Sequence, residues 1–203
     1  MRKLLSGLLC IIMLSTFTVA FAEGETVSPV DKTIMELTNV INNNPNDAIA
    51  YSRRGGAYTS KNLFDQAISD YNKAIEINPR YAFAYAGRAW VHSKKEEIDA
   101  AISDYSKAIE LDPSFARAFN NRGAMYSKKG QHDLAITDFQ RAVEIDPKYS
   151  LAYFGLGVAY ERKASYQNAI DAFRKLILNA TMPQDKPLVD SAQNHIRELG
   201  GTL

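Results

Sequence analysis

Hydrophobic and polar residues follow a helical period along most of the chain. In one unit, apolar and small residues recur three and four positions apart from about Ala48 to Ser60, and again from about Phe64 to Ile77. This spacing is typical of amphipathic helices that bury one face. The first helix ends near Asn62, which can adopt the left-handed backbone. The second ends before Pro79, because a residue that precedes proline is pushed out of helical geometry.

The same pattern returns every 34 residues. The recurring residues are the prolines Pro45, Pro79, Pro113 and Pro147, the alanines Ala67, Ala101, Ala135 and Ala169, and the aromatic residues Tyr71, Tyr105, Phe139 and Phe173. A fixed period of this length, with two helices in each unit, indicates a stack of helix pairs in which each unit packs on its neighbours.

The repeated residues resemble those of the tetratricopeptide repeat (TPR) family. In the first unit the resemblance rests on Tyr51, Gly55, Tyr58, Ala67, Tyr71, Ala74 and Pro79, and later units carry their copies. It covers four units, at 48–81, 82–115, 116–149 and 150–183, of which the last is divergent. The resemblance implies an all-α fold, a right-handed superhelical solenoid of antiparallel helix pairs, and a role in binding other proteins or peptides. A fold of this kind does not name the partner.

The N-terminal segment, residues 1–22, is expected to be a secretory signal peptide. Two basic residues follow Met1, the run from Leu4 to Ala20 is mostly apolar, and residues 20–22 fit a small-x-small cleavage pattern before Glu23. The alternative is an uncleaved membrane anchor, although the apolar run is shorter than the roughly 20 residues that a spanning helix needs. We therefore expect a bacterial periplasmic or secreted protein that is not inserted in the membrane after cleavage.

Cleavage would change the charge and the cysteine content of the chain. The 24 basic residues would fall to 22 against 23 acidic ones, so that the net charge would move from +1 to about −1. The single cysteine, Cys10, would also be removed, so that no disulfide could form. Neither charge provides the basic excess that nucleic-acid binding requires, and nucleic acid is not an expected partner.

Capping helices are predicted at both ends of the stack. Residues 23–47 comprise a polar linker and a helix over Asp31–Asn43 that matches the second helix of a unit, with Leu37 where Tyr71 stands one period later. Residues 184–203 comprise a helix opened by Pro187. Its apolar side carries Leu188, Val189, Ala192, Ile196 and Leu199, and its opposite side is polar. Such a helix would seal the exposed end of a solenoid.

Two sets of charges recur with the repeat. Arg54, Arg88 and Arg122 in the first helices are matched by Asp70, Asp104 and Asp138 in the second helices, and both positions become apolar in the fourth unit, at Leu156 and Ala172. This paired change predicts an Arg–Asp contact that fixes helix register, with independent solvated charges as the alternative. Lys61, Lys95, Lys129 and Lys163 close the first helices. We interpret them as cations that complement helix C-termini, with a basic ridge as the alternative.

No arrangement of residues points to catalysis, a metal or another cofactor. The three histidines, His92, His132 and His195, fall in different units without cysteines or carboxylates at ligand spacing. Glycine-rich phosphate loops and nucleophile motifs are missing from the sequence. We therefore expect a non-enzymatic scaffold. Two alternatives remain: a self-associating structural subunit, which the polar last helix disfavours, and an accessory subunit of an envelope enzyme or secretion complex.

The resemblance implies a binding site on the concave face, which the first helices line in this family. The candidate residues are Arg53, Phe83, Trp90, Arg117, Asn120, Asn121 and Phe154. Some family members hold a terminal carboxylate with Lys and Asn, but Ser52 and Gly56 stand at the first two of those positions here. The expected ligand is a peptide segment with apolar anchors and an acidic group. The alternative is that Phe83 and Trp90 only fill space between repeats.

Overall fold

The computed structural model describes residues 27–202, and the expected signal peptide lies outside this range. All regular structure in the described range is helical. The helices are α1 (Pro29–Asn43), α2 (Ala48–Ser60), α3 (Phe64–Ile77), α4 (Ala82–Lys94), α5 (Ile98–Leu111), α6 (Ala116–Lys128), α7 (His132–Ile145), α8 (Ser150–Arg162), α9 (Tyr166–Asn179), the short 3-10 helix η1 (Pro183–Asp185) and α10 (Lys186–Glu198).

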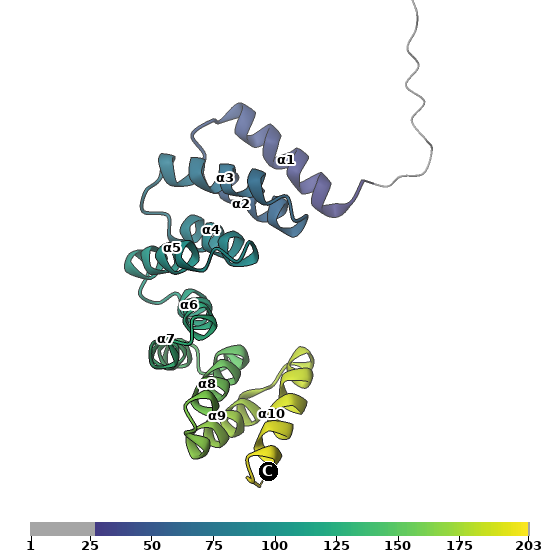
Figure 1. Cartoon of the computed structure of the whole chain (residues 1–203). Helices are drawn as coiled ribbons and strands as arrows, with labels where there is room; N and C mark the ends of the chain where they lie inside the picture. Colours follow the sequence, from purple (N-terminus) through teal and green to yellow (C-terminus); the bar gives the residue numbers. More distant parts are fainter. Residues whose placement is uncertain (1–26, 203) are drawn as a thin grey trace, which may run out of the picture.

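The helices form an arc of stacked pairs (Figure 1). Each first helix (α2, α4, α6 and α8) packs on the second helix that follows it (α3, α5, α7 and α9) and on the second helix of the preceding unit. Helices α4 and α6 lie on the inner side of the arc, and α5 and α7 lie on its outer side, while α1 and α10 close the two ends (Figure 1). The predicted all-α solenoid of helix pairs is confirmed.

The helix ends agree closely with those predicted in the first unit. Helices α2 and α3 span the predicted residues, and the side chain of Asp47 caps α2 by accepting a hydrogen bond from the backbone N–H of Ala50 at 2.9 Å. Helix α1 begins at Pro29, two residues before the predicted start, because Ser28 caps it by accepting from the N–H of Asp31. Helix α10 begins at Lys186, one residue before Pro187.

The turn inside each unit uses one residue in the left-handed conformation. Asn62 was expected there and has a φ of 57°, and Gly130 at the same place in the third unit has a φ of 72°. The equivalent residues of the second and fourth units are Glu96, at 61°, and Ala164, at 53°. Glutamate and alanine carry a Cβ that disfavours this conformation, so these two turns hold backbone strain that the glycine turn avoids.

Aromatic rings packed on small residues form the core between helices. Ala67, Ala101 and Ala135 are completely buried, as are the rings of Tyr105 and Phe173. The ring of Tyr71 lies against Gly87 so closely that a Cβ at this glycine would come within 2.4 Å of it. Because Gly87 has no side chain, Tyr71 reaches from α3 to the inner side of the arc.

The predicted Arg–Asp contacts are confirmed in the first three repeats. Arg122 Nε donates to Asp138 Oδ2 at 2.8 Å, and Arg122 Nη2 donates to Asp138 Oδ1 at 2.8 Å. Arg54–Asp70 and Arg88–Asp104 have the same paired geometry. Each guanidinium also donates through Nη1 to the preceding second helix, at Thr38, Asn72 or Ser106. One arginine thus joins three helices.

The lysines that close the first helices make contacts that the sequence did not predict. Each ammonium lies on an aspartate at the start of the preceding second helix, and the pairs are Lys61–Asp31, Lys95–Asp65, Lys129–Asp99 and Lys163–Asp133. The Lys129–Asp99 separation is 2.5 Å, and that of Lys95–Asp65 is 3.4 Å. They stand at the C-caps of the first helices, as expected, and they also connect neighbouring repeats, so they do not form a free basic ridge.

Helix α10 covers the last repeat as predicted. Ala192 and Ile196 are completely buried in a cluster with Phe173 and Leu176 of α9. The chain then turns at Gly200, and the guanidinium of Arg174 donates to the carbonyl oxygen of Thr202 at 2.6 Å from Nη2. In residues 27–202 we find no helix whose length and apolar character would let it cross a bilayer.

Candidate functional site

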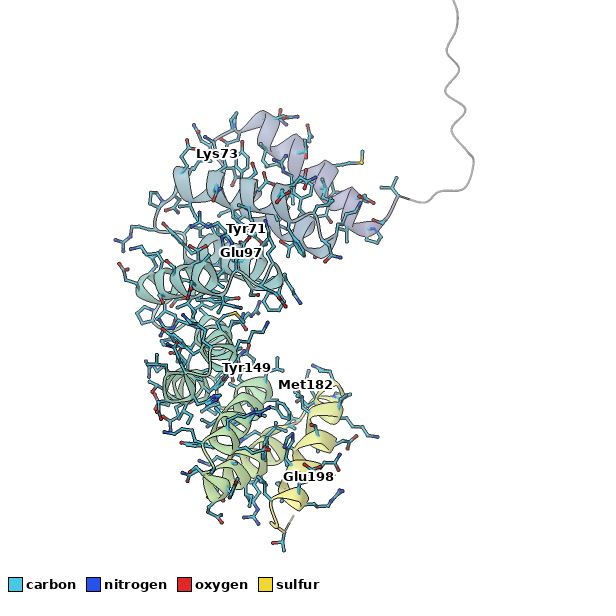
Figure 2. The ribbon with its side chains drawn as sticks, in the orientation of Figure 1. Tyr71, Lys73, Glu97, Tyr149, Met182 and Glu198 are labelled. Carbon is cyan, nitrogen blue, oxygen red and sulfur yellow. The ribbon has the colours of Figure 1, made fainter. Side chains whose placement is uncertain are left out.

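A groove of about 580 Å³ lies on the inner side of the arc across the second and third repeats. Its lining comes mainly from α4, α6 and α8 and comprises Tyr71, Phe83, Ala86, Gly87, Trp90, Tyr105, Phe115, Arg117, Ala118, Asn121, Tyr149 and Leu151. Tyr71 and Tyr149, labelled in Figure 2, lie on either side of α6 along the stack. A volume of this size is in the range of ligand-binding pockets.

Four of the seven predicted site residues meet in this groove. They are Phe83, Trp90, Arg117 and Asn121. Asn120 is buried beneath them, and its amide nitrogen donates to Asn121 Oδ1 at 3.0 Å. Asn120 therefore orients Asn121 and presents little surface of its own.

The other two predicted residues lie outside this groove. Arg53 borders a separate hollow of about 290 Å³ beside the start of α1. Phe154 packs on Phe173 and on His195 of α10, with ring centroids 5.8 Å apart in both cases. Helix α10 thus occupies the space in which Phe154 was expected to meet a ligand.

The apolar part of the groove is open to solvent. Phe83 and Leu151 are 58% and 52% exposed, and Trp90 is 42% exposed. The ring of Phe83 packs on that of Phe115 with centroids 4.9 Å apart, and the ammonium of Lys94 lies 4.5 Å from the Trp90 ring centroid. Phe83 and Trp90 therefore do more than fill space between repeats, because large parts of both side chains face solvent.

The polar part of the groove consists of Arg117, Asn121 and the phenol of Tyr149, and the fully buried Tyr105 lies behind Asn121. Asn121 Nδ2 donates to the hydroxyl of Tyr105 at 3.2 Å. Burial raises the pKa of Tyr105, and it also raises that of Tyr149, where the positive charge of Arg117 acts in the opposite direction. Both phenols are therefore neutral hydrogen-bonding groups at physiological pH. Arg117 is exposed and has no ion-pair partner among residues 27–202.

Several lining residues were not among the predicted site residues, and two of them left a signal in the sequence. Phe115 and Tyr149 stand immediately before a first helix, in the place that Tyr81 holds one unit earlier. This recurring aromatic residue precedes α4, α6 and α8 and lies at the edge of the inner face. Tyr71 and Tyr105 are buried core residues, and only the three-dimensional packing places them against the groove.

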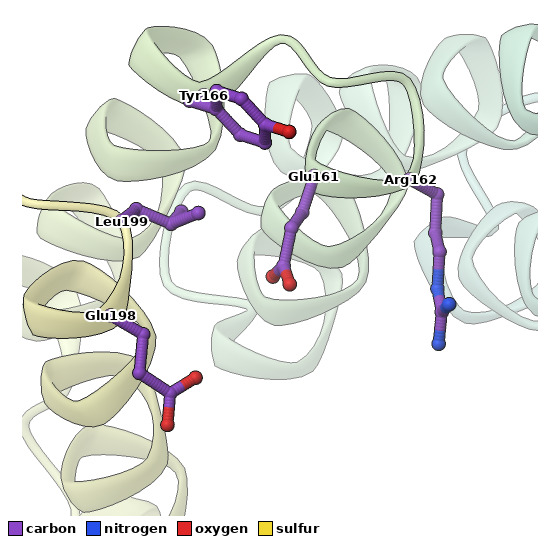
Figure 3. Close-up of a pocket in the computed structure, with 5 residues that line it drawn as sticks. All are labelled: Glu161, Arg162, Tyr166, Glu198 and Leu199. Carbon is purple, nitrogen blue, oxygen red and sulfur yellow. The ribbon is translucent and has the colours of Figure 1, made fainter.

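A second hollow, of about 590 Å³, lies between α8 and α10 and has a different chemistry. It is lined by Glu161, Arg162, Tyr166, Glu198 and Leu199. The carboxylates of Glu161 and Glu198 both extend into it (Figure 3). Glu161 also lies 2.9 Å from Nδ1 of His195. Within residues 27–202, no group of three or more His, Cys, Asp or Glu side chains is arranged to hold a metal ion.

Sequence profiles of one repeat family match most of the stack. The profile described as "Tetratricopeptide repeat" matches residues 48–81 and 116–149, and a second with this description matches residues 151–180. The profile described as "TPR repeat" matches residues 91–130. Together these stretches span more than half of the chain. No curated protein matches the chain.

Solved structures with the same fold include proteins of different kinds. A crystal structure of MamA is 25% identical, has a TM-score of 0.67, and the match covers 81% of this chain and 99% of that chain. PilF of Pseudomonas aeruginosa is 25% identical, with a TM-score of 0.65 and coverage of 74% and 69%. The first TPR of Spaghetti (RPAP3), bound to an HSP90 peptide, is 25% identical, with a TM-score of 0.56 and coverage of 58% and 93%.

Proposed function

The chain belongs to the tetratricopeptide repeat proteins, and from this premise we propose that it is a non-catalytic interaction scaffold that binds a segment of a partner protein in the inner groove. Proteins of this family are protein-interaction scaffolds. The observation that carries the proposal is the open aromatic and aliphatic surface of Phe83, Trp90 and Leu151. Clustered apolar side chains on a concave surface are a common signature of a protein interface.

The polar groups of the groove favour a peptide rather than a purely apolar ligand. Arg117 and Asn121 provide donors for a backbone carbonyl or a carboxylate, and the phenol of Tyr149 adds a neutral hydrogen-bonding group. The RPAP3 relative is a TPR bound to an HSP90 peptide, which supports a peptide as the class of occupant. Ser52 and Gly56 stand where the complete carboxylate-binding set would have Lys and Asn, so we do not propose that this chain binds a terminal carboxylate in that way.

A selection from random peptides tests the groove. Random twelve-residue peptides displayed on phage would be selected on the wild-type chain and then measured on Trp90→Ala/Arg117→Ala. We expect binding to fall at least tenfold, because Trp and Arg dominate many interfaces. Arg53→Ala is the matched control, since it removes an inner-side arginine outside the groove. Equal binding by the wild type and both variants would move the interaction to another surface.

We also propose that the chain is exported, and this proposal rests on its sequence alone. The basic start, the apolar run and the small residues before Glu23 support a cleaved signal peptide and a periplasmic or secreted product. N-terminal sequencing of the protein expressed in bacteria should give a chain that starts at Glu23. Recovery of the uncut chain in the membrane fraction would favour the membrane-anchored alternative.

Self-association is the second candidate function, because apolar side chains are exposed at both ends of the stack. Met35 of α1 is 65% exposed, and Leu178 of α9 and Met182 are 80% and 55% exposed. Leu178 stands where the preceding repeats have the charged residues Glu110 and Glu144. If molecules associate through these ends, light scattering should give a mass that rises with concentration. Leu178→Glu should abolish this rise. A constant monomeric mass would exclude this candidate.

A further inference from the structure

The inward-facing positions of the four first helices carry charge of only one sign. Each first helix presents four residues at positions i, i+4, i+7 and i+11, which lie on one helical face. In order, these are Ile49, Arg53, Gly56 and Ser60; Phe83, Gly87, Trp90 and Lys94; Arg117, Asn121, Ala124 and Lys128; and Leu151, Gly155, Val158 and Arg162. This set contains five cations and no carboxylate, whereas the whole chain has a net charge of only +1.

Three of these cations form a row at the C-terminal ends of the first helices. We call Lys94, Lys128 and Arg162 the basic rim. All three are exposed, and none has an ion-pair partner within 4 Å among residues 27–202. Lys94 lies over the ring of Trp90, a groove residue, so the rim is continuous with the groove.

The residue that follows each rim cation is a lysine with an ion-pair partner. Lys95, Lys129 and Lys163 each lie on an aspartate of the preceding second helix. The two adjacent cations at the end of each of these helices therefore have different roles. The second of each pair is neutralised and joins the repeats, while the charge of the first is left uncompensated beside the groove.

The rim is strongest in its first two members. Glu161 and Glu198 line the same hollow as Arg162, so the local charge at the fourth repeat is offset by carboxylates (Figure 3). The carboxylates of Asp65 and Glu97 are both paired with Lys95, the residue that follows Lys94. Near Lys128, Asp99 is engaged by Lys129. Lys94 and Lys128 thus carry the free positive charge of the rim.

We propose that the partner segment is acidic: its apolar side chains occupy the groove and its carboxylates lie on Lys94 and Lys128. This inference rests on the proposed function of the groove and names the chemistry of its ligand. Lys94 and Lys128 hold equivalent positions on α4 and α6, so carboxylates spaced along one extended segment would meet them in turn. A face of one charge also speeds association with oppositely charged partners and rejects basic ones.

The test removes the rim charges without replacing any residue that lines the groove. Random twelve-residue peptides displayed on phage would be selected on the wild type, on Lys94→Gln/Lys128→Gln, and on the control Lys107→Gln/Lys175→Gln. The control removes the same two charges from α5 and α9, which are second helices. We expect Asp and Glu to be enriched beside apolar residues for the wild type and the control, and this acidic enrichment to be lost for the rim variant. A synthetic copy of a wild-type-selected peptide should bind the rim variant about threefold to tenfold more weakly, and raising the salt concentration should narrow that difference.

Each contrary outcome has a distinct meaning. Peptides that depend on Trp90 and Arg117 but show no acidic enrichment, or the same enrichment with the rim variant, would overturn the acidic partner and leave the proposed groove function standing. Failure to select any peptide that depends on Trp90 and Arg117 would overturn the groove function itself. Competition by single-stranded DNA as strong as that by the selected peptide would show a general polyanion surface and would overturn the assignment to an acidic protein segment.

Discussion

Leu156 of α8 and Ala172 of α9 share one buried cluster at the two positions where the preceding repeats pair an arginine with an aspartate. The substitution is coordinated, because keeping either charged residue alone would leave a buried charge without its partner. Gln140, which stands where Ser106 accepts a hydrogen bond from Arg122 one repeat earlier, instead donates to the hydroxyl of Tyr160 at 2.9 Å. The last repeat therefore uses apolar packing for the role that charged hydrogen bonds have in the first three.

The natural exchange in the fourth repeat predicts a rescue in the third. Arg122→Leu should cost about 2–4 kcal/mol, because Asp138, only 3% exposed, would lose its partner. Adding Asp138→Ala should recover at least about 1 kcal/mol, since the double variant reproduces the Leu156–Ala172 arrangement. Urea unfolding followed by circular dichroism measures both. A double variant that is no more stable than Arg122→Leu would contradict the structural role of the pair.

The strained turns of the second and fourth repeats should be improved by glycine. Ala164→Gly and Glu96→Gly remove the Cβ at positions whose φ values are 53° and 61°. Each substitution should raise the free energy of unfolding by about 0.5–1 kcal/mol. Gly130→Ala is the reciprocal control, and it should destabilise the third repeat by a similar amount because φ there is 72°. Thermal and urea unfolding would show whether the two glycine variants gain stability while Gly130→Ala loses it.

Buried tyrosines predict a loss of stability in alkali. Burial raises the pKa of Tyr71, Tyr105 and Tyr149 above the ordinary value of 10.0. The unfolded chain therefore loses these phenolic protons at lower pH than the folded chain does. Stability should be constant below about pH 10 and fall as the pH rises further, because the folded state then binds more protons. Tyr105→Phe should make this fall less steep, as measured by urea unfolding between pH 8 and 11. An unchanged pH slope would show that Tyr105 does not contribute.

The contact between Tyr71 and Gly87 connects the core to the groove. Gly87→Ala should cost about 1–3 kcal/mol, since the new Cβ would stand 2.4 Å from the Tyr71 ring and displace it. The displaced ring should also weaken peptides selected on the groove. Gly56→Ala is the milder control, because its Cβ would come no closer than 3.6 Å to the Tyr71 hydroxyl. Unfolding and peptide binding by fluorescence anisotropy separate the two effects, and equal behaviour of the two variants would contradict the steric argument.

The sequence predicted the fold and the Arg–Asp contacts because internal repeats act as independent samples of one structure. The coordinated change at Leu156 and Ala172 indicated contact between positions 16 residues apart. The Lys–Asp contacts escaped prediction because they join different repeats, over 30 residues, and a lysine at a helix end already had a local explanation.

The groove was predicted only in part, for a related reason. Helical spacing identifies which residues share a face, and it correctly placed Phe83, Trp90, Arg117 and Asn121 together. Whether a face is open depends on what packs over it. Phe154 follows the inner-side residue Leu151 at helical spacing, but its ring packs against α10. Tyr71 and Tyr105 were missed because both are buried core residues, and only the packing of the helices places them against the groove.

The C-terminal end should control the docking of α10. Arg174 holds the carbonyl of Thr202, and the ring of His195 stacks on Phe173 with centroids 5.0 Å apart. Arg174→Ala should cost about 1 kcal/mol of local stability, because the side chain is partly exposed and its hydrogen bonds are only partly desolvated. Hydrogen exchange should then be faster in α10 and unchanged in α4 and α6. Arg141→Ala, which removes an exposed i,i+3 pair with Glu144 in α7, should leave α10 unaffected. If α10 exchanges at the wild-type rate in Arg174→Ala, packing of Ile196 and Ala192 alone holds the helix in place.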